Sequence, residues 1–217
     1  MLRPMRLLTC NVGGATAKLA AYALAEGEPR RLGGLDLRRD PAWSAAAFAT
    51  EIVVRSKVLA DQIETRAWDA VAHRIVHGGP QHRHAALLDS AVREAILQAT
   101  PLAPLHNPVA LAVADQIAAR LPGLPQVAVF DTGFFADLPD VASGYALPRS
   151  LSGARDLVRC GFHGLAHAAM WETASSVHVS PRPRRIGGRG PRRTGPGCVD
   201  GLLHARGPGD GHTLRRP

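Results

Sequence analysis

The chain has 217 residues, of which 46% are hydrophobic and 20% charged, as in an ordinary folded globular protein. Its formal net charge of +8 comes from one end, because residues 173–217 hold nine arginines against two aspartates. No apolar run reaches membrane-spanning length, and the first one is too short for a secretory signal, so neither insertion nor export is indicated.

The N-terminal third predicts short strands followed by a helix. Residues 5–12 (MRLLTCNV) and 17–24 (AKLAAYAL) are apolar runs separated by GGAT, which is typical of two strands joined by a tight turn. We expect a third strand at 33–39 (GGLDLRR). In residues 41–64 the apolar positions recur at three and four residues, which predicts a helix.

Strands and helices continue to alternate beyond this helix, which predicts an α/β class. Asp89 or Ser90 can cap the first of the two later helices, and the second has Pro108 near its start. The predicted elements are a strand at 68–79, helices at 89–100 and 106–123, and a strand at 126–133.

This pattern stops near Thr173. Glycine and proline make up 15 of the final 45 residues, and hydrophobic spacing disappears, which predicts a disordered tail. The cysteines Cys10, Cys160 and Cys198 are odd in number and unrelated in spacing, so they form neither a disulfide framework nor a zinc knuckle. We therefore expect a reducing, cytoplasmic location.

Polar residues lie at the ends of the predicted strands. The turn at 11–18 (NVGGATAK) offers backbone N–H groups, the Thr16 hydroxyl and the Lys18 ammonium to a phosphate chain, although most such turns are plain hairpins. Arg74 ends a buried strand beside glycines, where it either binds a ligand or forms a strand-end salt bridge. Asp131 ends an apolar strand, where a buried carboxylate requires a cation or hydrogen-bond donors.

Histidines supply further candidates. His106 stands just before a helix, where it either lines a site or caps the helix. His163 lies between two glycines with His167 one helical turn later, a spacing that suits a metal pair but lacks an acidic third ligand nearby. The segment 77–84 (HGGPQHRH) is rich in histidine, but its Pro and Arg favour an exposed loop over a metal site.

In this order, NVGGATAK, AHRIVHGG, APLHNP, VAVFDTGF, YALP and GFHGLAH closely resemble the acetate kinase family of acyl-phosphate-forming kinases. The resemblance runs from about Arg6 to Trp171. It implies the actin-like, sugar-kinase-like (ribonuclease H-like) α/β fold and transfer of the γ-phosphoryl of ATP to a small carboxylate with Mg²⁺ or Mn²⁺. We expect an N-terminal domain at 1–148, the start of a second domain at 149–172 and a tail at 173–217.

The resemblance places the phosphate side of the site on the first hairpin. Asn11 would lie by the metal and the phosphates, and Gly13, Thr16 and Lys18 would bind nucleotide phosphate. The family usually has a run of serines after Asn-x-Gly, whereas this chain has Gly-Ala-Thr and keeps one hydroxyl.

The acceptor side falls on the other motifs. Arg74 would hold the carboxylate or the moving phosphoryl group, and His106 would line that site. Asp131 would be the catalytic acid, and His163 would stabilise the transition state. Because a carboxylate acceptor is already ionised at pH 7, we expect Asp131 to orient Arg74 or a metal-bound water rather than to remove a proton.

The family's second domain is not readable in the remaining sequence. Translated one nucleotide out of phase, however, residues 200–217 can encode Met-Gly-Phe-Ser-Thr-Pro-Glu-Gly-Leu-Val-Met-Ala-Thr-Arg-Ser-Gly-Asp, which resembles a family segment that carries an arginine. We therefore expect a shift of reading frame just after Trp171. The chain would then be a truncated, weakly active or inactive acetate kinase.

Two alternatives stay open. A propionate kinase fits the same motifs, because apolar residues set the size of the acyl pocket. The second alternative is a non-catalytic remnant whose basic tail binds nucleic acid. A shifted reading frame, however, explains the tail without such a function. The expected partners are ATP or ADP and acetate or acetyl phosphate, with no membrane, and the resemblance implies a homodimer for the full-length form.

Overall fold

The structure is a computed structural model that describes residues 3–26, 29–63, 68–148, 150 and 157–177. These residues form two compact units. Within the described ranges, the first unit comprises 3–133 and 162–165, and the second comprises 134–161 and 166–177.

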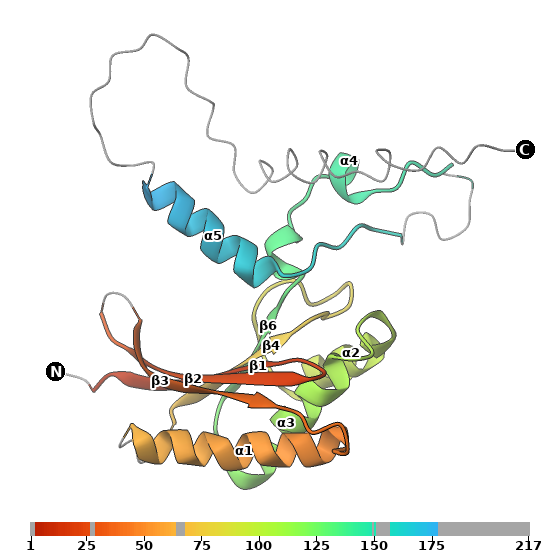
Figure 1. Cartoon of the computed structure of the whole chain (residues 1–217). Helices are drawn as coiled ribbons and strands as arrows, with labels where there is room; N and C mark the ends of the chain where they lie inside the picture. Colours follow the sequence, from red (N-terminus) through yellow and green to blue (C-terminus); the bar gives the residue numbers. More distant parts are fainter. Residues whose placement is uncertain (1–2, 27–28, 64–67, 149, 151–156, 178–217) are drawn as a thin grey trace, which may run out of the picture. The chain divides into compact units, whose positions relative to one another are not determined.

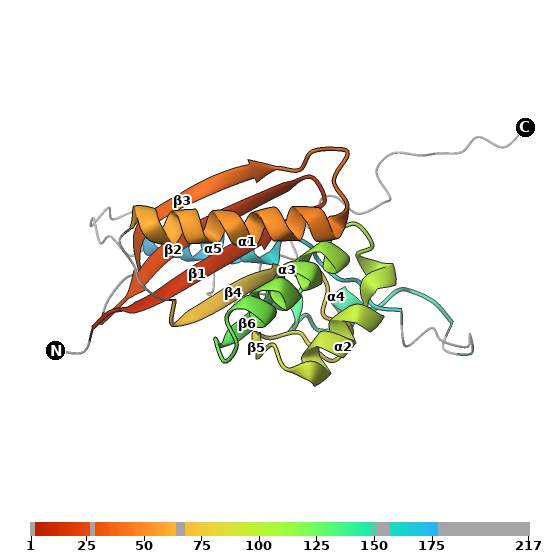
Figure 2. The ribbon, with the colours of Figure 1, turned by 90° about the horizontal axis from the view of Figure 1, so that it is seen from below.

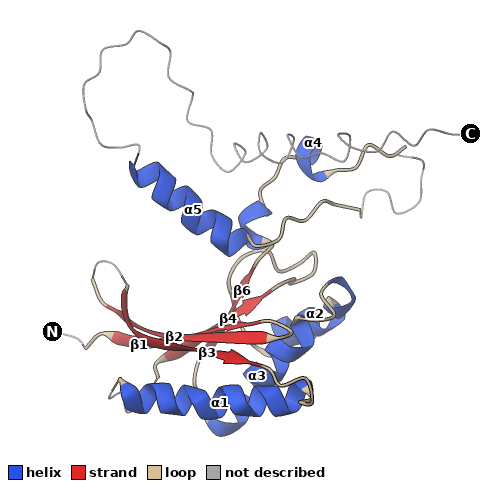
Figure 3. Cartoon of the chain, in the orientation of Figure 1, coloured by secondary structure: helices blue, strands red, loops and turns tan. Residues whose placement is uncertain are grey.

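A mixed six-stranded sheet forms the centre of the first unit (Figure 1, Figure 3). Its order is β3-β2-β1-β4-β6-β5, in which β1 pairs antiparallel with β2 and parallel with β4, and β4 pairs parallel with β6. The strands are β1 (Met5–Val12), β2 (Thr16–Leu24), β3 (Arg30–Arg38), β4 (Ala70–Ile75), β5 (Ala86–Leu87) and β6 (Gln126–Phe130).

Three helices cover one face of this sheet (Figure 1, Figure 2). Ser44 caps the first helix by accepting a hydrogen bond from the Ala47 N–H at 3.1 Å, and Asp89 caps the second by accepting one from Val92 at 2.8 Å. The helices are α1 (Ala45–Gln62), α2 (Ser90–Gln98) and α3 (Asn107–Arg120), with a short 3₁₀ turn η1 (Thr100–Leu102) before α3.

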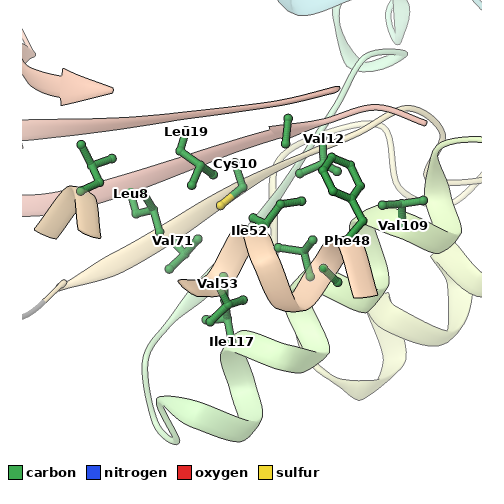
Figure 4. Close-up of a cluster of buried hydrophobic side chains, with 14 of the residues drawn as sticks. Leu8, Cys10, Val12, Leu19, Phe48, Ile52, Val53, Val71, Val109 and Ile117 are labelled. Carbon is green, nitrogen blue, oxygen red and sulfur yellow. The ribbon is translucent and has the colours of Figure 1, made fainter. Parts of the chain in front are cut away.

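The core lies between the sheet and these helices (Figure 4). Leu8, Cys10 and Val12 of β1 are buried there, in one cluster with Phe48 and Ile52 of α1. Burial of each large apolar side chain of this kind stabilises the fold by about 1.5–3 kcal/mol. Because side chains alternate along a strand, the intervening residues of β1 point to the other face of the sheet.

The second unit contains small elements and one longer helix. Phe135 is buried, and its ring meets that of His167 edge-on with 5.6 Å between centroids. Gly144 and Val158 form an isolated antiparallel bridge. The elements are η2 (Gly133–Phe135), which begins at the end of the first unit, α4 (Asp140–Ser143) and α5 (Gly164–Val177).

The predicted strands and helices of the α/β pattern are confirmed, with β3 beginning at Arg30 rather than at residue 33. The loss of apolar pattern predicted near Thr173 falls in the last part of α5, which continues to Val177. Residues without apolar periodicity can prolong a helix, and the Thr173 hydroxyl donates to the Ala169 carbonyl at 2.8 Å. The rest of the predicted tail, 178–217, lies outside the described residues.

The described cysteines are unpaired: Cys10 is buried and Cys160 is exposed, while Cys198 lies outside the described residues. Within the described part of the chain, no helix combines the length and apolar character needed to cross a bilayer. The domain boundaries expected at 148 and 172 stay predictions.

Candidate functional site

Polar side chains form a row across one end of the sheet. Lys18 of β2 lies opposite Asn11 of β1, and Arg74 is on β4, the next strand. The neighbouring residues Ala17, Cys10 and His73 are buried on the face that the helices cover. Because side chains alternate along a strand, the site residues therefore point to the opposite face of the sheet. Parallel β1, β4 and β6 all present their carboxyl ends at this edge.

A hydrogen-bond network joins three of the predicted site residues. Arg74 donates from Nε to both carboxylate oxygens of Asp131 at 3.0 Å, and from Nη2 to Oδ2. Arg74 Nη1 donates to Asn11 Oδ1 at 3.0 Å. Both carboxylate oxygens are thus engaged, and the guanidinium is held in one plane between two strands.

The burial of this ion pair is asymmetric. The side chain of Asp131 is 1% exposed, whereas that of Arg74 is 21% exposed. A buried carboxylate is costly without donors, and Arg74 supplies them. One edge of the guanidinium therefore anchors the side chain, while the positive group remains reachable from solvent for an anion.

His106 lies beside the turn of the first hairpin. A β-carbon on Gly13 would stand 4.0 Å from His106 Cδ2. A β-carbon on Gly14 would stand 3.1 Å from the Leu105 carbonyl oxygen. The Gly13 N–H donates to the Thr16 carbonyl at 2.7 Å, which closes the turn. The structure thus places Gly13, Thr16 and His106 in one neighbourhood. His106 makes no side-chain cap to α3.

His163 adopts a backbone conformation that is uncommon for a side-chain-bearing residue, with φ of 59°. The next residue, Gly164, donates its N–H to the Asp131 carbonyl at 2.9 Å, which brings the His163 backbone next to the Arg74–Asp131 pair. Non-glycine residues in this region are enriched at functional sites, where surrounding contacts hold them.

The loop after β4 is tightly held. His77 is buried and accepts a hydrogen bond at Nδ1 from the Gly79 N–H at 2.9 Å, so neutral His77 carries its proton on Nε2. Burial, with a smaller contribution from the charge of Arg83, lowers the pKa of His77. The His77 ring meets Phe162 edge-on at 6.4 Å between centroids.

The described residues contain no group of three His, Cys, Asp or Glu side chains that could hold a metal ion. In the segment 77–84, the His82 ring stacks on Phe130 at 6.2 Å between centroids. Among the predicted metal ligands, exposed Asn11 has an amide oxygen at the site, and that oxygen already accepts one hydrogen bond from Arg74.

Two polar residues at the site were not predicted as functional. Asn107 is fully buried, and its side-chain amide donates to the His77 carbonyl. The Thr132 hydroxyl is buried next to Asp131 and has no hydrogen-bond partner among the described atoms. Neither feature has a local sequence signal, because each depends on contacts between distant segments.

Comparisons with known proteins agree on one family. Residues 41–182 match the profile of the acetokinase family. An acetate kinase of Arthrobacter sp. (strain FB24) is 44% identical over 112 residues, which are 52% of this chain and 29% of that protein. The crystal structure of Porphyromonas gingivalis acetate kinase is 28% identical, with a TM-score of 0.62 over 80% of this chain and 49% of its own. A propionate kinase from Francisella tularensis is 25% identical, with a TM-score of 0.62 over 81% and 49%.

The fold is thus the α/β fold of acetate and propionate kinases, and the predicted ribonuclease H-like class is confirmed. The chain belongs to the acetokinase family. The family match begins at Pro41, so the hairpin with Gly13, Thr16 and Lys18 lies outside the match. The match ends at residue 182, beyond the frame shift predicted after Trp171. The matched part of the chain covers between 29% and 35% of the length of these curated relatives.

Proposed function

We propose that the chain carries the acceptor side of a phosphotransferase site, at which the γ-phosphoryl of ATP moves reversibly to acetate to give acetyl phosphate and ADP. The observation that carries the proposal is the Arg74 guanidinium, held by buried Asp131 and facing Asn11 at the edge of the sheet. Carboxyl ends of strands in an open α/β sheet are the usual place for such a site.

In this proposal Arg74 aligns two anions. The acceptor carboxylate is ionised at neutral pH and needs no base, so the barrier lies in bringing it against a charged phosphoryl group. A fixed guanidinium lowers that barrier by placing positive charge where negative charge accumulates. Asp131 is a positioning residue here, since both of its oxygens accept hydrogen bonds from Arg74.

The remaining predicted residues fit around this centre. His106 lines the side next to Gly13, and His163 donates to the phosphoryl oxygens in the transition state. Lys18 and Thr16 bind nucleotide phosphate from β2. These roles follow the family motifs, and the exposed positions of Lys18, Thr16 and His163 leave them accessible to a nucleotide.

Mg²⁺, or Mn²⁺ in its place, would neutralise phosphate charge when bound with the nucleotide. The chain offers it few ligands: Asn11 Oδ1 can provide one oxygen with its second lone pair, while Asp131 is occupied by Arg74. Mg²⁺ commonly binds through one or two protein oxygens together with phosphates and waters. The residues present therefore suit a metal that arrives with ATP.

Acetate is the proposed acceptor, and propionate is the competing one. The solved propionate kinase has the same TM-score as the solved acetate kinase, at 25% against 28% sequence identity. One methylene in an apolar pocket changes preference by roughly 10- to 200-fold. Assays with both acids at equal concentration separate the two assignments.

We also propose that this chain has little turnover by itself, because the matched residues cover only 29% to 35% of the curated relatives and the rest of their length would complete the site. The proposed frame shift near Trp171 has a direct test, which is to sequence the DNA from the Gly161 codon past the stop codon. If the extra base is absent from that DNA, the gene encodes a family-like continuation, and if the extra base persists, the shift lies in the gene itself. DNA in which removal of one base yields no family-like continuation would contradict the shift.

The function itself is tested by trapping acetyl phosphate as its hydroxamate in the presence of ATP, acetate and Mg²⁺. We expect near-background turnover from the 217-residue chain and measurable turnover from a frame-corrected product. In that product, Arg74→Ala should lower kcat about 100- to 1,000-fold. Turnover unaffected by Arg74→Ala would overturn the proposed role of Arg74. Robust turnover by the 217-residue chain would overturn the proposal that it has little activity by itself.

A further inference from the structure

We infer that Asn107 is a positioning residue, whose buried side-chain amide fixes the position of Arg74 relative to His106. This inference rests on the proposed anion site. Asn107 is the first residue of α3 and is 0% exposed. Its Nδ2 donates to the His77 carbonyl at 2.8 Å and to the Ile96 carbonyl at 3.2 Å. Its Oδ1 accepts from the His77 N–H at 3.4 Å.

These contacts join three segments that are distant in sequence. His77 continues the strand end that carries Arg74, Ile96 lies in the last turn of α2, and Asn107 directly follows His106. His106 in turn lies beside Gly13 of the first hairpin. One amide therefore ties the Arg74 strand to the segment that presents His106.

The side chain is not used as asparagine usually is at a helix start. Asparagine commonly caps a helix by accepting from the N–H groups of its first turn. Here Asn107 lies inside the first turn, Pro108 follows it, and its backbone N–H donates to the Ala103 carbonyl at 3.0 Å. The amide is thereby free to bind the two other segments, which a capping role does not require.

Only a side-chain amide satisfies all three backbone groups. It supplies two N–H donors for the carbonyls and one acceptor for the His77 N–H. An aspartate has the same shape but lacks the donors, and alanine leaves the backbone groups without partners in a buried place. Either change removes the link between the Arg74 strand and His106 while leaving both side chains intact.

The test compares Asn107→Ala and Asn107→Asp with a control on the same helix, Ile117→Ala, which removes a side chain that is 1% exposed. In ligand-free protein, the NMR resonances of the Arg74 Nε–H and the His106 ring should move in both Asn107 variants and stay in place in Ile117→Ala. A titration with inorganic phosphate should then show affinity lowered about tenfold or more in the Asn107 variants and nearly unchanged in the control.

Unmoved resonances with wild-type phosphate affinity in both Asn107 variants would overturn the inference. If wild-type protein binds no phosphate, the proposed function fails, while the ligand-free resonances still decide the role of Asn107. If the Asn107 variants do not fold, hydrogen exchange in the wild-type chain decides. Protected His77 N–H and Asn107 side-chain protons support the link, and rapid exchange of both while α3 stays protected overturns it.

Discussion

At the scale of single residues, the site depends on how one carboxylate is buried. The side chains of Asp131 and Arg74 are 1% and 21% exposed. Arg93 also donates two hydrogen bonds to a carboxylate, that of Asp115, but the side chains of Asp115 and Arg93 are 47% and 41% exposed. Exposed ion pairs contribute little to stability because water and salt screen them. The chain thus contains its own matched comparison of a buried and an exposed arginine–carboxylate pair.

Asp131→Asn removes the negative charge and keeps the shape. We predict that the free energy of unfolding falls by about 1.5–3 kcal/mol, because hydrogen bonds to a charged group are replaced by weaker ones. Asp115→Asn should cost less than about 1 kcal/mol. Urea denaturation of both variants measures the two values. Equal losses in the two variants would show that burial of Asp131 does not strengthen its pair.

A second residue-scale prediction concerns His73, which is 1% exposed on the strand that carries Arg74. His73 Nε2 lies 2.6 Å from Gln126 Oε1, and its Nδ1 has no partner among the described atoms. Because an amide oxygen accepts, Nε2 carries the proton of the neutral ring. Burial lowers the pKa of His73 from 6.5 to about 4.

The unfolded chain therefore binds a proton at His73 as the pH falls below 6.5, while the folded chain does not until about 4. The stability from a neutral His73 is fully present above pH 6.5 and is lost between these two values, by about 3 kcal/mol in all. Urea midpoints between pH 7.5 and 4 should show this loss, and His73→Gln should reduce it. An identical pH profile in that variant would contradict the assignment.

At the scale of elements, hydrophobic spacing was sufficient for β1, β2, β4, β6 and the helices α1, α2 and α3. The two-residue strand β5 (Ala86–Leu87) and the short turns η1 and η2 carry no period, so no pattern could reveal them. The helix α5 (Gly164–Val177) was not among the predicted elements either, and its last turn is polar and small rather than periodic.

The site was predictable only in part. Arg74 stands out in the sequence because it lies in a largely apolar strand that ends at two glycines, and Asp131 because it directly follows a run of apolar strand residues. Their contact depends on parallel pairing of β4 with β6, in which Arg74 lies opposite Val129, and no local pattern encodes that pairing. The bond from Asn107 to His77 joins residues thirty positions apart and was invisible for the same reason.

Close approach between elements gives a third prediction, at Gly133 after β6. A β-carbon there would stand 2.6 Å from the Arg83 carbonyl oxygen, a backbone atom that must shift. We expect Gly133→Ala to cost about 1–3 kcal/mol in thermal or urea unfolding.

Gly123→Ala is the matched control, because Gly123 has a φ of +82° but nothing within 4 Å of a new β-carbon. Its cost should be only the backbone strain of about 1–2 kcal/mol. Retention of wild-type stability by Gly133→Ala would mean that residues 83 and 133 do not approach as closely as the structure shows.

At the scale of the whole molecule, the two described cysteines report on the two units separately. Cys10 is buried in the core of the first unit, and burial raises its pKa to about 12, so its thiolate is nearly absent at neutral pH. Cys160 belongs to the second unit and is exposed. A thiol probe therefore distinguishes local access from opening of the core.

We predict that iodoacetamide at pH 8 alkylates Cys160 rapidly and Cys10 at least about 1,000-fold more slowly, at a rate set by unfolding of the first unit. Mass spectrometry of tryptic peptides measures both sites, with Cys198→Ser removing the third thiol. Moderate urea should accelerate the reaction of Cys10 selectively. Comparable rates for the two thiols without urea would contradict the buried position of Cys10.

The central claim is that the Arg74 guanidinium, oriented by Asp131, is the anion-binding group of an acetokinase site. The most direct measurement is an NMR titration of the chain with acetyl phosphate, monitored at the Arg74 Nε–H and the His106 ring. Arg55→Ala serves as control, because Arg55 is half exposed and pairs with Glu51 on α1.

The account predicts saturable shifts at both probes in the wild-type chain and in Arg55→Ala, and loss of saturation at the His106 ring, the remaining probe, in Arg74→Ala. Shifts that are absent in the wild type, or that persist unchanged in Arg74→Ala, would contradict it.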